Sequence, residues 1–318
     1  MRRTAAVVLG CALALSVVAC AEVPADADPV PHVDGAQGAQ APGDDASLAG
    51  APAPAKQVVL PPVRGTFDYQ LGGAYDAVPG GEGDGGDGGD GTPTIDVVVR
   101  DATADPLPGA YNVCYVNGFQ TQPDAAGLWT DEHPDLLLRD ADGELVVDPD
   151  WPDEYVLDPS TEPQRDGILA VIGPVVTGCA DAGFDAVEID NLDTWTRFDQ
   201  IDDAGAYALA SAYVDLAHAQ GLAIAQKNAA EIAPVAHREL GFDFAVTEEC
   251  GAWSECADYT DVYGDHVLQV EYPDALDEAG LTFDDVCALD DRAPLTVLRD
   301  LDLVAPDAEG YVYEACAG

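Results

Sequence analysis

Basic residues are scarce in this sequence, which has 12 Lys and Arg against 60 Asp and Glu and a formal net charge of −48. Only Lys56 and Lys227 are lysines. Binding to phosphate backbones or anionic lipid headgroups requires a basic patch, so the composition argues against nucleic acid and against an anionic membrane surface as partners. It would attract a polycation instead. A saline habitat or a GC-rich genome is an alternative cause of the total charge.

Long hydrophobic runs are also missing. The one apolar run, residues 5–18, is shorter than the roughly 20 residues that a membrane-spanning helix needs. It follows two arginines and ends in Val17-Val18-Ala19-Cys20, which has the form of a bacterial lipobox. We therefore expect residues 1–19 to be a lipoprotein signal peptide, with lipidated Cys20 as the only membrane contact, in the cell envelope. An ordinary secretory signal with a chance cysteine is the alternative.

The usual ligand patterns of zinc, a Cys-x-x-Cys pair or a histidine cluster, do not occur. We therefore expect neither a metal nor a cofactor. Six cysteines remain after the lipobox, and an even number in an exported protein indicates disulfides, although six cysteines allow about 15 connectivities. Cys250 and Cys256 are close enough to close a small loop, and two other pairs complete the set. The expected pairs are Cys250–Cys256, Cys287–Cys316 and Cys114–Cys179.

Local composition divides the chain into regions. Residues 20–58 are rich in Ala, Pro, Asp and Gly without periodicity, which is typical of a disordered linker. Residues 80–91 are almost entirely Gly and Asp and are expected to be a flexible insertion. Residues 59–318 form the predicted domain, and their number matches the roughly 250 residues typical of one (β/α)8 barrel.

Hydrophobic patterning within residues 59–318 predicts an α/β protein, a single-domain (β/α)8 TIM barrel preceded by a disordered tether. Short apolar runs alternate with longer amphipathic segments, as expected for parallel strands joined by helices. Helices are expected at 165–182, where Gly173-Pro174 can introduce a kink, and at 203–220 and 229–240. Strands are expected at 66–71, 95–101, 111–117, within 183–193, at 222–228, within 241–250, at 266–272 and at 294–300.

Residues 120–160 are acidic and aromatic and contain Trp129 and Trp151. Long loops of this kind often form a wall of a substrate site. Packing of both tryptophans in the core is the equally weighted alternative.

Acidic and amide residues gather where two predicted strands end. Asp190, Asn191 and Asp193 follow the strand within 183–193, and Glu248 and Glu249 follow the strand within 241–250. Catalytic groups of a barrel lie at the carboxyl ends of its strands. Two acids on two such strands indicate the carboxylate pair of a glycoside hydrolase. The alternative is that these acids only cap loops or add surface charge.

Several segments, taken together and in order, carry a resemblance: Phe67-Asp68-Tyr69-Gln70-Leu71, Val113-Cys114-Tyr115, Gly183-Phe184-Asp185-Ala186-Val187-Glu188-Ile189-Asp190-Asn191, Ala225-Gln226-Lys227-Asn228, Asp243-Phe244-Ala245-Val246-Thr247-Glu248-Glu249-Cys250 and Val270-Glu271-Tyr272. They resemble the domain of glycoside hydrolase family 114, the endo-α-1,4-polygalactosaminidase family. The resemblance implies a TIM barrel that hydrolyses α-1,4-linked galactosamine polymers. Asp190 matches the acid of the fourth strand, and Glu248 matches the acid that opens a Glu-x-Cys pattern on the sixth. Glu249 lies at a variable position, and residues 80–91 depart from the family.

The resemblance also implies roles for individual residues. Asp190 is the expected nucleophile and Glu248 the expected general acid/base of an endo-acting enzyme that retains anomeric configuration. The tyrosines either stack on sugar faces or fill the barrel, and Lys227 either binds substrate hydroxyls or forms a structural ion pair. A cationic, partly deacetylated polysaccharide is the expected partner of a monomeric protein. Expected substrate-binding residues are Tyr69, Asp101, Tyr115, Asn191, Asp193, Lys227, Asn228, Glu249, Glu271 and Tyr272.

Two other functional classes compete with this hypothesis. A barrel lipoprotein that binds glycan without cleaving it would keep the tyrosines and acids but would not need a correctly spaced acid pair. A metal-dependent hydrolase would use the aspartates, but barrel metal sites usually add histidine ligands. The histidines lie away from the predicted strand ends; they are His32, His133, His218, His237 and His266.

Overall fold

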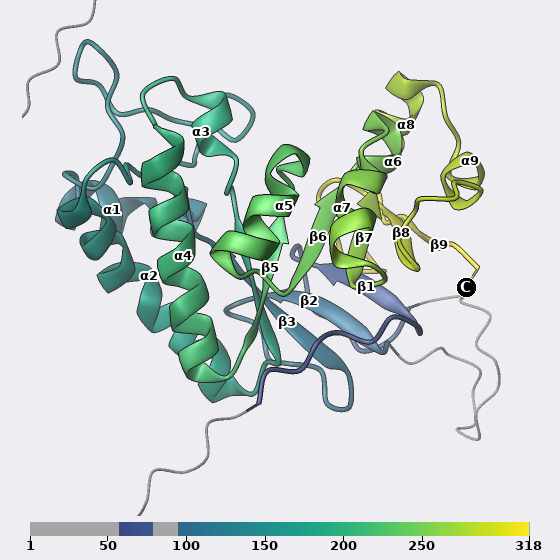
Figure 1. Ribbon diagram of the computed structural model, residues 1–318. Helices are drawn as coiled ribbons and strands as arrows, with labels where there is room; N and C mark the ends of the chain where they lie inside the picture. The colour runs from purple at the N-terminus through teal and green to yellow at the C-terminus, as the bar shows by residue number, and fades with distance from the viewer. Residues whose placement is uncertain (1–56, 79–94, 318) are drawn as a thin grey trace, which may run out of the picture. The chain divides into compact units, whose positions relative to one another are not determined.

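The computed structural model describes residues 57–78 and 95–317. The signal peptide, Cys20, nearly all of the linker and the Gly/Asp-rich insertion therefore lie outside the described residues. In the described part, eight parallel strands follow one another in sequence order, and a ninth runs antiparallel to the eighth (Figure 1). This order confirms the predicted TIM barrel. The strands are β1 (Phe67–Gln70), β2 (Val97–Asp101), β3 (Tyr111–Asn117), β4 (Ala186–Asp190), β5 (Ala223–Lys227), β6 (Phe244–Glu248), β7 (Val267–Glu271), β8 (Leu295–Arg299) and β9 (Tyr313–Ala315).

Alternation of side chains along each strand separates two layers of core. On β4, Ala186 packs among side chains that fill the barrel interior. Val187 and Ile189 pack instead in the cluster between the strands and the helices. Because successive side chains point to opposite faces, Glu188 and Asp190 lie on the interior face with Ala186. The fourth strand thus carries two acids, one above the other, into the barrel.

Two long helices, α2 (Glu162–Ala182) and α4 (Asp203–Gln220), pack against each other outside β3 to β5 (Figure 1). Thr161 and Gln164 form a capping box at the start of α2, which continues through Pro174. Gly221 ends α4 with φ of +75°. No helix within the described ranges is long and apolar enough to cross a membrane. Shorter elements are η1 (Pro123–Ala125), α1 (Ala126–Glu132), α3 (Thr194–Arg197), α6 (Cys250–Trp253), α7 (Cys256–Tyr263), α8 (Pro273–Ala279) and α9 (Phe283–Cys287).

The helix expected at 229–240 is divided into three short turns. Ala229 has φ of +58°, so the backbone changes direction before the segment begins. Pro234 has no N–H to donate, and a new turn starts beside it. The turns are a 3-10 turn η2 (Ala230–Ile232), an α turn α5 (Ala233–Val235) and a π turn η3 (Ala236–Leu240).

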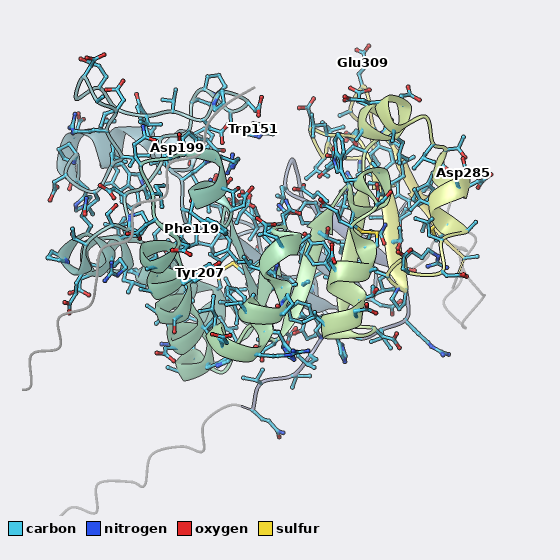
Figure 2. All side chains as sticks on the ribbon, turned by 45° about the horizontal axis from the view of Figure 1, so that its top comes forward. Phe119, Trp151, Asp199, Tyr207, Asp285 and Glu309 are labelled. Atoms are coloured by element: carbon cyan, nitrogen blue, oxygen red, sulfur yellow. A yellow bond between two sulfur atoms is a disulfide. The ribbon has the colours of Figure 1, made fainter. Side chains whose placement is uncertain are left out.

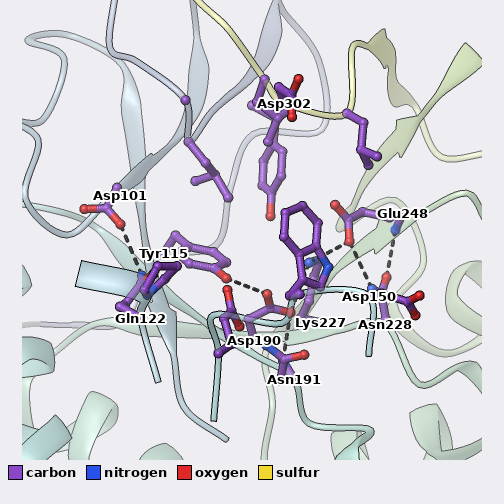
Figure 3. Close-up of a pocket in the computed structure, with 18 of the residues that line it drawn as sticks. Asp101, Tyr115, Gln122, Asp150, Asp190, Asn191, Lys227, Asn228, Glu248 and Asp302 are labelled. Carbon is purple, nitrogen blue, oxygen red and sulfur yellow. Dashed lines mark hydrogen bonds and ion pairs between the residues drawn. The ribbon is translucent and has the colours of Figure 1, made fainter. Parts of the chain in front are cut away.

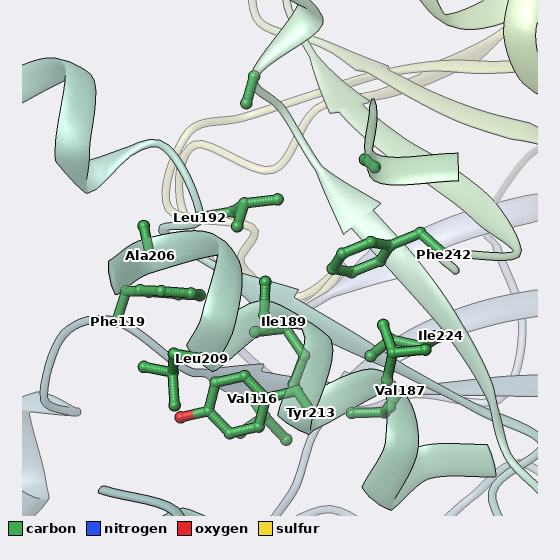
Figure 4. Close-up of a cluster of buried hydrophobic side chains, with 14 of the residues drawn as sticks. Val116, Phe119, Val187, Ile189, Leu192, Ala206, Leu209, Tyr213, Ile224 and Phe242 are labelled. Atoms are coloured by element: carbon green, nitrogen blue, oxygen red, sulfur yellow. The ribbon is translucent and has the colours of Figure 1, made fainter. Parts of the chain in front are cut away.

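A fully buried cluster joins α4 to the outer face of β4. Phe119, Ile189, Leu209 and Tyr213 each have 0% of their surface exposed (Figure 4). The Tyr213 hydroxyl donates to the carbonyl of Gly118 over 2.8 Å. A Cβ atom at Gly118 would lie 2.4 Å from the Ile189 side chain, so only glycine fits there. This packing fixes β4, and with it the acids at its end.

A buried ion pair closes the barrel between β1 and β8. The two strands are in contact, but β8 makes its backbone ladders with β7 and β9. The Arg299 guanidinium spans the junction and donates to the Asp68 carboxylate over 2.6 Å and to the Tyr69 carbonyl. Both side chains are 0% exposed. A side chain of β8 thus replaces backbone hydrogen bonds at this seam.

All three predicted disulfides are present, Cys114–Cys179, Cys250–Cys256 and Cys287–Cys316. The first joins β3 to α2, and the third joins α9 to the segment after β9. In the described ranges, the sulfurs of Cys250 and Cys256 and the Glu271 carboxylate form the one cluster of potential metal ligands. Because the two sulfurs are bonded to each other, they offer no thiolate to a metal.

Candidate active site

A cavity of about 650 Å³ opens at the carboxyl ends of the strands. Side chains from β1, β3, β4, β5 and β6 form its floor, and Asp101 at the end of β2 and the segments after β3, β4 and β8 form its walls (Figure 3). Every substrate-binding and catalytic residue expected from the sequence lines it except Glu271. The barrel therefore brings together residues that lie up to about two hundred positions apart, as the acid-tipped strands predicted.

Lys227 occupies the centre of the cavity floor, between Asp190 and Glu248 (Figure 3). Its Nζ lies 2.8 Å from Glu248 Oε2, 3.1 Å from Asp190 Oδ1 and 3.7 Å from Glu188 Oε1. Its side chain is only 3% exposed. Burial alone would lower the pKa of Lys227, but the three carboxylates raise it well above its ordinary value. A permanent positive charge therefore links the two expected catalytic acids.

Asp190 is held as a carboxylate by three donors. It accepts from the Tyr115 hydroxyl over 2.6 Å, from Lys227 over 3.1 Å and from the Asn191 backbone N–H over 2.8 Å. Burial would raise the pKa of Asp190, but Lys227 and these hydrogen bonds lower it below its usual range. An ionised carboxylate that is only 17% exposed and faces a cavity has the properties of a nucleophile.

Glu248 lies across the cavity floor from Asp190 and is more accessible, with 24% of its side chain exposed. One carboxylate oxygen accepts from the Tyr272 hydroxyl over 2.5 Å, and the other accepts from the Asn228 amide over 3.2 Å. The Asn228 side chain also accepts from the Glu248 backbone N–H over 2.8 Å. Asn228 and Tyr272 therefore fix the Glu248 carboxylate while leaving it open to the cavity.

Arg197 organises one wall of the cavity, and no motif or pattern in the sequence indicates this role. Its guanidinium pairs with Asp148, which is buried, and donates to Asn191 over 2.7 Å and to Asp193 over 3.2 Å. Asn191 and Asp193 thus have a protein partner before any ligand binds. Asp101, the last residue of β2, also lines the cavity and accepts from Gln122 over 3.3 Å.

The acidic loop after β3 contains one tryptophan that packs in the core and one that lines the cavity. Each of the two roles considered for these tryptophans therefore applies to one of them. Trp129 is 2% exposed and packs in the core. Trp151 is 48% exposed, lines the cavity and projects above the strand ends (Figure 2). Glu154, which the sequence reading missed, also lines the cavity and accepts from the Asn117 amide over 2.9 Å. Burial, together with nearby aspartates, raises the pKa of Glu154 to about 7.

The substrate-binding role expected of Glu271 is wrong. Its carboxylate is 0% exposed and accepts from the backbone N–H groups of Gly251 and Ala252 and from the Gln269 amide. Val270 and Tyr272 face the barrel interior, so strand alternation turns Glu271 to the outside, where it anchors the start of α6.

The sugar stacking considered for Tyr69 is also wrong, because its ring is 0% exposed and packs in the barrel interior. Its hydroxyl donates to Glu188 over 2.7 Å. Tyr115 is 9% exposed, and its hydroxyl serves Asp190. Tyr69 therefore fills the barrel, which was the alternative to sugar stacking. Lys227 forms buried ion pairs, which were the alternative to binding substrate hydroxyls.

Comparison with known proteins places the chain in a family. The family model described as glycoside-hydrolase family GH114 matches residues 47–318. No protein of curated function matches the sequence. The structure resembles that of Aspergillus fumigatus Ega3 in complex with galactosamine, with 18% identity, a TM-score of 0.59, and coverage of 82% of this chain and 98% of that one. It also resembles the glycoside hydrolase domain of PelA from Pseudomonas aeruginosa, with 15% identity, a TM-score of 0.49, and coverage of 78% and 97%. The chain belongs to glycoside hydrolase family GH114.

Proposed function

We propose that this glycosidase is an endo-acting, retaining hydrolase of α-1,4-linked polysaccharides that contain galactosamine. The observation that carries the proposal is the pair Asp190 and Glu248, held on one cavity floor by the shared ammonium of Lys227. The galactosamine complex of the similar structure supports the choice of sugar.

The pair divides the reaction into two displacements. Asp190 attacks the anomeric carbon while Glu248 protonates the glycosidic oxygen, so the bond to the leaving chain breaks and a glycosyl ester of Asp190 forms. Glu248, now a carboxylate, then takes a proton from water, whose oxygen attacks the same carbon and releases Asp190. Lys227 stabilises the carboxylate that Glu248 becomes after the first step, since the ammonium lies 2.8 Å from its oxygen.

The spacing of the acids supports retention. One ammonium lies 3.1 Å from Asp190 Oδ1 and 2.8 Å from Glu248 Oε2. The distance between these two oxygens cannot exceed the sum of their distances to the ammonium nitrogen. That limit is below the separation of about 6.5–9.5 Å that inverting enzymes need to admit a water.

The walls of the cavity favour a cationic substrate. Glu154 and Asp193 are buried enough that desolvation raises both pKa values, and an ammonium group beside them would replace their lost solvation. Trp151 offers an exposed ring face to a sugar. Further acids on the cavity wall are Asp101, Asp150, Asp153, Glu249 and Asp302.

The test uses the full chain and a partly deacetylated α-1,4-galactosamine polymer, with reducing ends counted over time. Asp190→Asn and Glu248→Gln should each lower the rate about 100-fold or more. Asp199→Asn and Glu309→Gln make the same chemical changes at exposed positions and should leave the rate unchanged (Figure 2). If Glu248→Gln alone stays active, Glu249 becomes the acid candidate. A folded wild type that binds the polymer without cleaving it would favour the glycan-binding alternative.

The same digests test the finer parts of the proposal. Endo-action predicts a rapid fall in polymer length before short products accumulate, whereas exo-action releases short products from the start. Retention predicts that the first products carry the α-anomer, which proton NMR distinguishes before mutarotation. β-anomers in the first spectra would assign inversion instead.

We further propose that the protein is exported and anchored through Cys20. The three disulfides support an oxidising compartment, and the lipobox itself lies outside the described residues. Labelling with a radioactive fatty acid should mark the wild-type chain and fail to mark Cys20→Ala. A chain released to the medium unlabelled in both forms would assign an ordinary secretory signal.

A further inference from the structure

Glu188 lies beneath the catalytic pair, on the same face of β4 as Asp190 and two residues before it. In the sheet it neighbours Tyr115 of β3 on one side and Ala225 of β5 on the other. Ala225 has a small, fully buried side chain, and Lys227 follows two residues later on the same face. Glu188 is 0% exposed, so substrate cannot touch it.

The contacts of the Glu188 carboxyl are unequal. Oε1 accepts from the Tyr69 hydroxyl over 2.7 Å and lies 3.7 Å from Lys227 Nζ. Oε2 is buried and has no hydrogen-bond partner among the described residues. An ionised carboxylate with one bare oxygen in a closed interior is costly, whereas a carboxylic acid can place its proton on that oxygen.

The charges around Glu188 point the same way. Among the described residues, Lys227 of β5 is the one cation that faces it, and this ammonium lies closer to Asp190 of β4 and Glu248 of β6. Tyr69 of β1 keeps its proton, because burial raises its pKa well above the ordinary value. Burial raises the pKa of Glu188 to about 8, Asp190 and Glu248 add to the rise, and Lys227 and Tyr69 oppose it.

We propose that Glu188 is a positioning residue that stays a neutral carboxylic acid beneath the pair and so leaves the charge of Lys227 to Asp190 and Glu248. Three ionised carboxylates would compete for one ammonium, and a charged Glu188 would draw it down into the barrel. A neutral Glu188 fills the space, binds Tyr69 and lets the ammonium stay between the acids. The catalytic consequence rests on the proposed function, but the protonation state does not.

The first experiment measures protonation through stability and needs no activity. A glutamic acid near 4.5 when unfolded and about 8 when folded holds a proton in the native state that the unfolded chain releases. Wild-type stability therefore falls as pH rises from about 4.5 to 8 on account of this group. Glu188→Gln has no such proton to lose. We expect its melting temperature relative to wild type to rise steadily from pH 5 to pH 8.

A flat difference would overturn the proposal. An ionised Glu188 that pairs with Lys227 would have a depressed folded pKa, and its stabilisation would be complete above about pH 4.5 and lost only at lower pH. The melting temperature of Glu188→Gln relative to wild type would then stay constant from pH 5 to pH 8. A relative melting temperature that falls over this range would overturn the proposal as well.

The second experiment measures catalysis with the galactosamine polymer. Glu188→Gln keeps the shape and the acceptor for Tyr69, so kcat/KM at pH 6 should stay within about threefold of wild type. Glu188→Ala removes the side chain that packs beneath Lys227, and its kcat/KM should fall more than about tenfold below that of wild type. Equal, large losses in both variants would mean that the carboxylate is required, which contradicts the proposal. If wild type cleaves no polymer, the proposed function fails, and the melting experiment still decides the state of Glu188.

Discussion

One ammonium decides the electrostatics of the site at the scale of single residues. Lys227 lies within 3.7 Å of three carboxyl groups and is almost completely buried. It lowers the pKa of Asp190, whereas Glu188, which is deeper and farther from the ammonium, has a raised pKa. Carboxyl groups at one site thus acquire different protonation states, because they differ in burial and in distance to the Lys227 ammonium.

Replacing this cation tests that account. Lys227→Met should reduce kcat/KM about 100-fold, because the ionised nucleophile loses its counter-charge. The Asp190 pKa should rise, so the acidic limb of the kcat/KM profile should move to higher pH. Steady-state rates on the galactosamine polymer between pH 4 and pH 8 provide the measurement. Lys56→Met, at the other lysine, is the matched control and should leave the profile unchanged. An unshifted acidic limb in Lys227→Met would contradict the account.

The sequence identifies the residues at strand ends better than those one layer below. Asp190 and Glu248 could be found because a polar residue that directly follows an apolar strand marks the mouth of a barrel. Glu188 was missed, although counting back two positions from Asp190 places it on the same face. Glu271 was assigned to the mouth for its position at a strand end, but the alternation with Val270 and Tyr272 sends its side chain outward.

At the scale of elements, the seam between β1 and β8 depends on one guanidinium. Arg299→Met should lower the free energy of unfolding by about 3–5 kcal/mol, because Asp68 is left buried without a counter-charge. Urea denaturation monitored by circular dichroism measures the loss. The double variant Asp68→Asn with Arg299→Met should recover part of it, since the stranded charge is gone. A single variant that loses less than about 1 kcal/mol would show that the ladders on either side suffice.

The eight parallel strands were predictable, and the seam was not. Short apolar runs with Gly or polar residues at both ends mark each strand locally. Arg299 and Asp68 are 231 positions apart, and nothing near either residue in the sequence indicates the other. The divided helix after β5 was missed for a related reason, because the left-handed backbone at Ala229 leaves no clear sequence signal.

We expect the loop after β3 to contribute to substrate binding rather than to the chemical step. Trp151 lines the cavity wall but contacts neither Asp190 nor Glu248 through any hydrogen bond or ion pair described above. Trp151→Ala should therefore raise KM about fivefold, roughly 1 kcal/mol of lost stacking, with kcat nearly unchanged. Initial rates over a range of polymer concentrations separate the two constants. A fall in kcat with constant KM would instead show that the Trp151 ring contacts the substrate only in the transition state.

At the scale of the whole molecule, the excess of acid creates a long-range negative field. The association of a polycationic glycan should therefore depend on salt. Raising ionic strength from about 10 mM to about 150 mM shortens the screening length from about 30 Å to about 8 Å and should lower kcat/KM about tenfold or more. The fully N-acetylated polymer is the neutral control, and any cleavage of it should respond weakly. Equal salt responses for both polymers would indicate that the negative charge of the protein reflects its habitat and does not attract the substrate.

The burial of Lys227 also determines how the protein can be modified chemically. It is the one lysine among the described residues, and only 3% of its side chain meets solvent. The described barrel therefore offers almost no nucleophilic amine to reagents in water. Amine-coupled dyes, resins or cross-linkers would have to attach through Lys56 or the amino terminus, both outside the described part of the chain. Immobilisation by such chemistry would leave the mouth of the barrel unmodified.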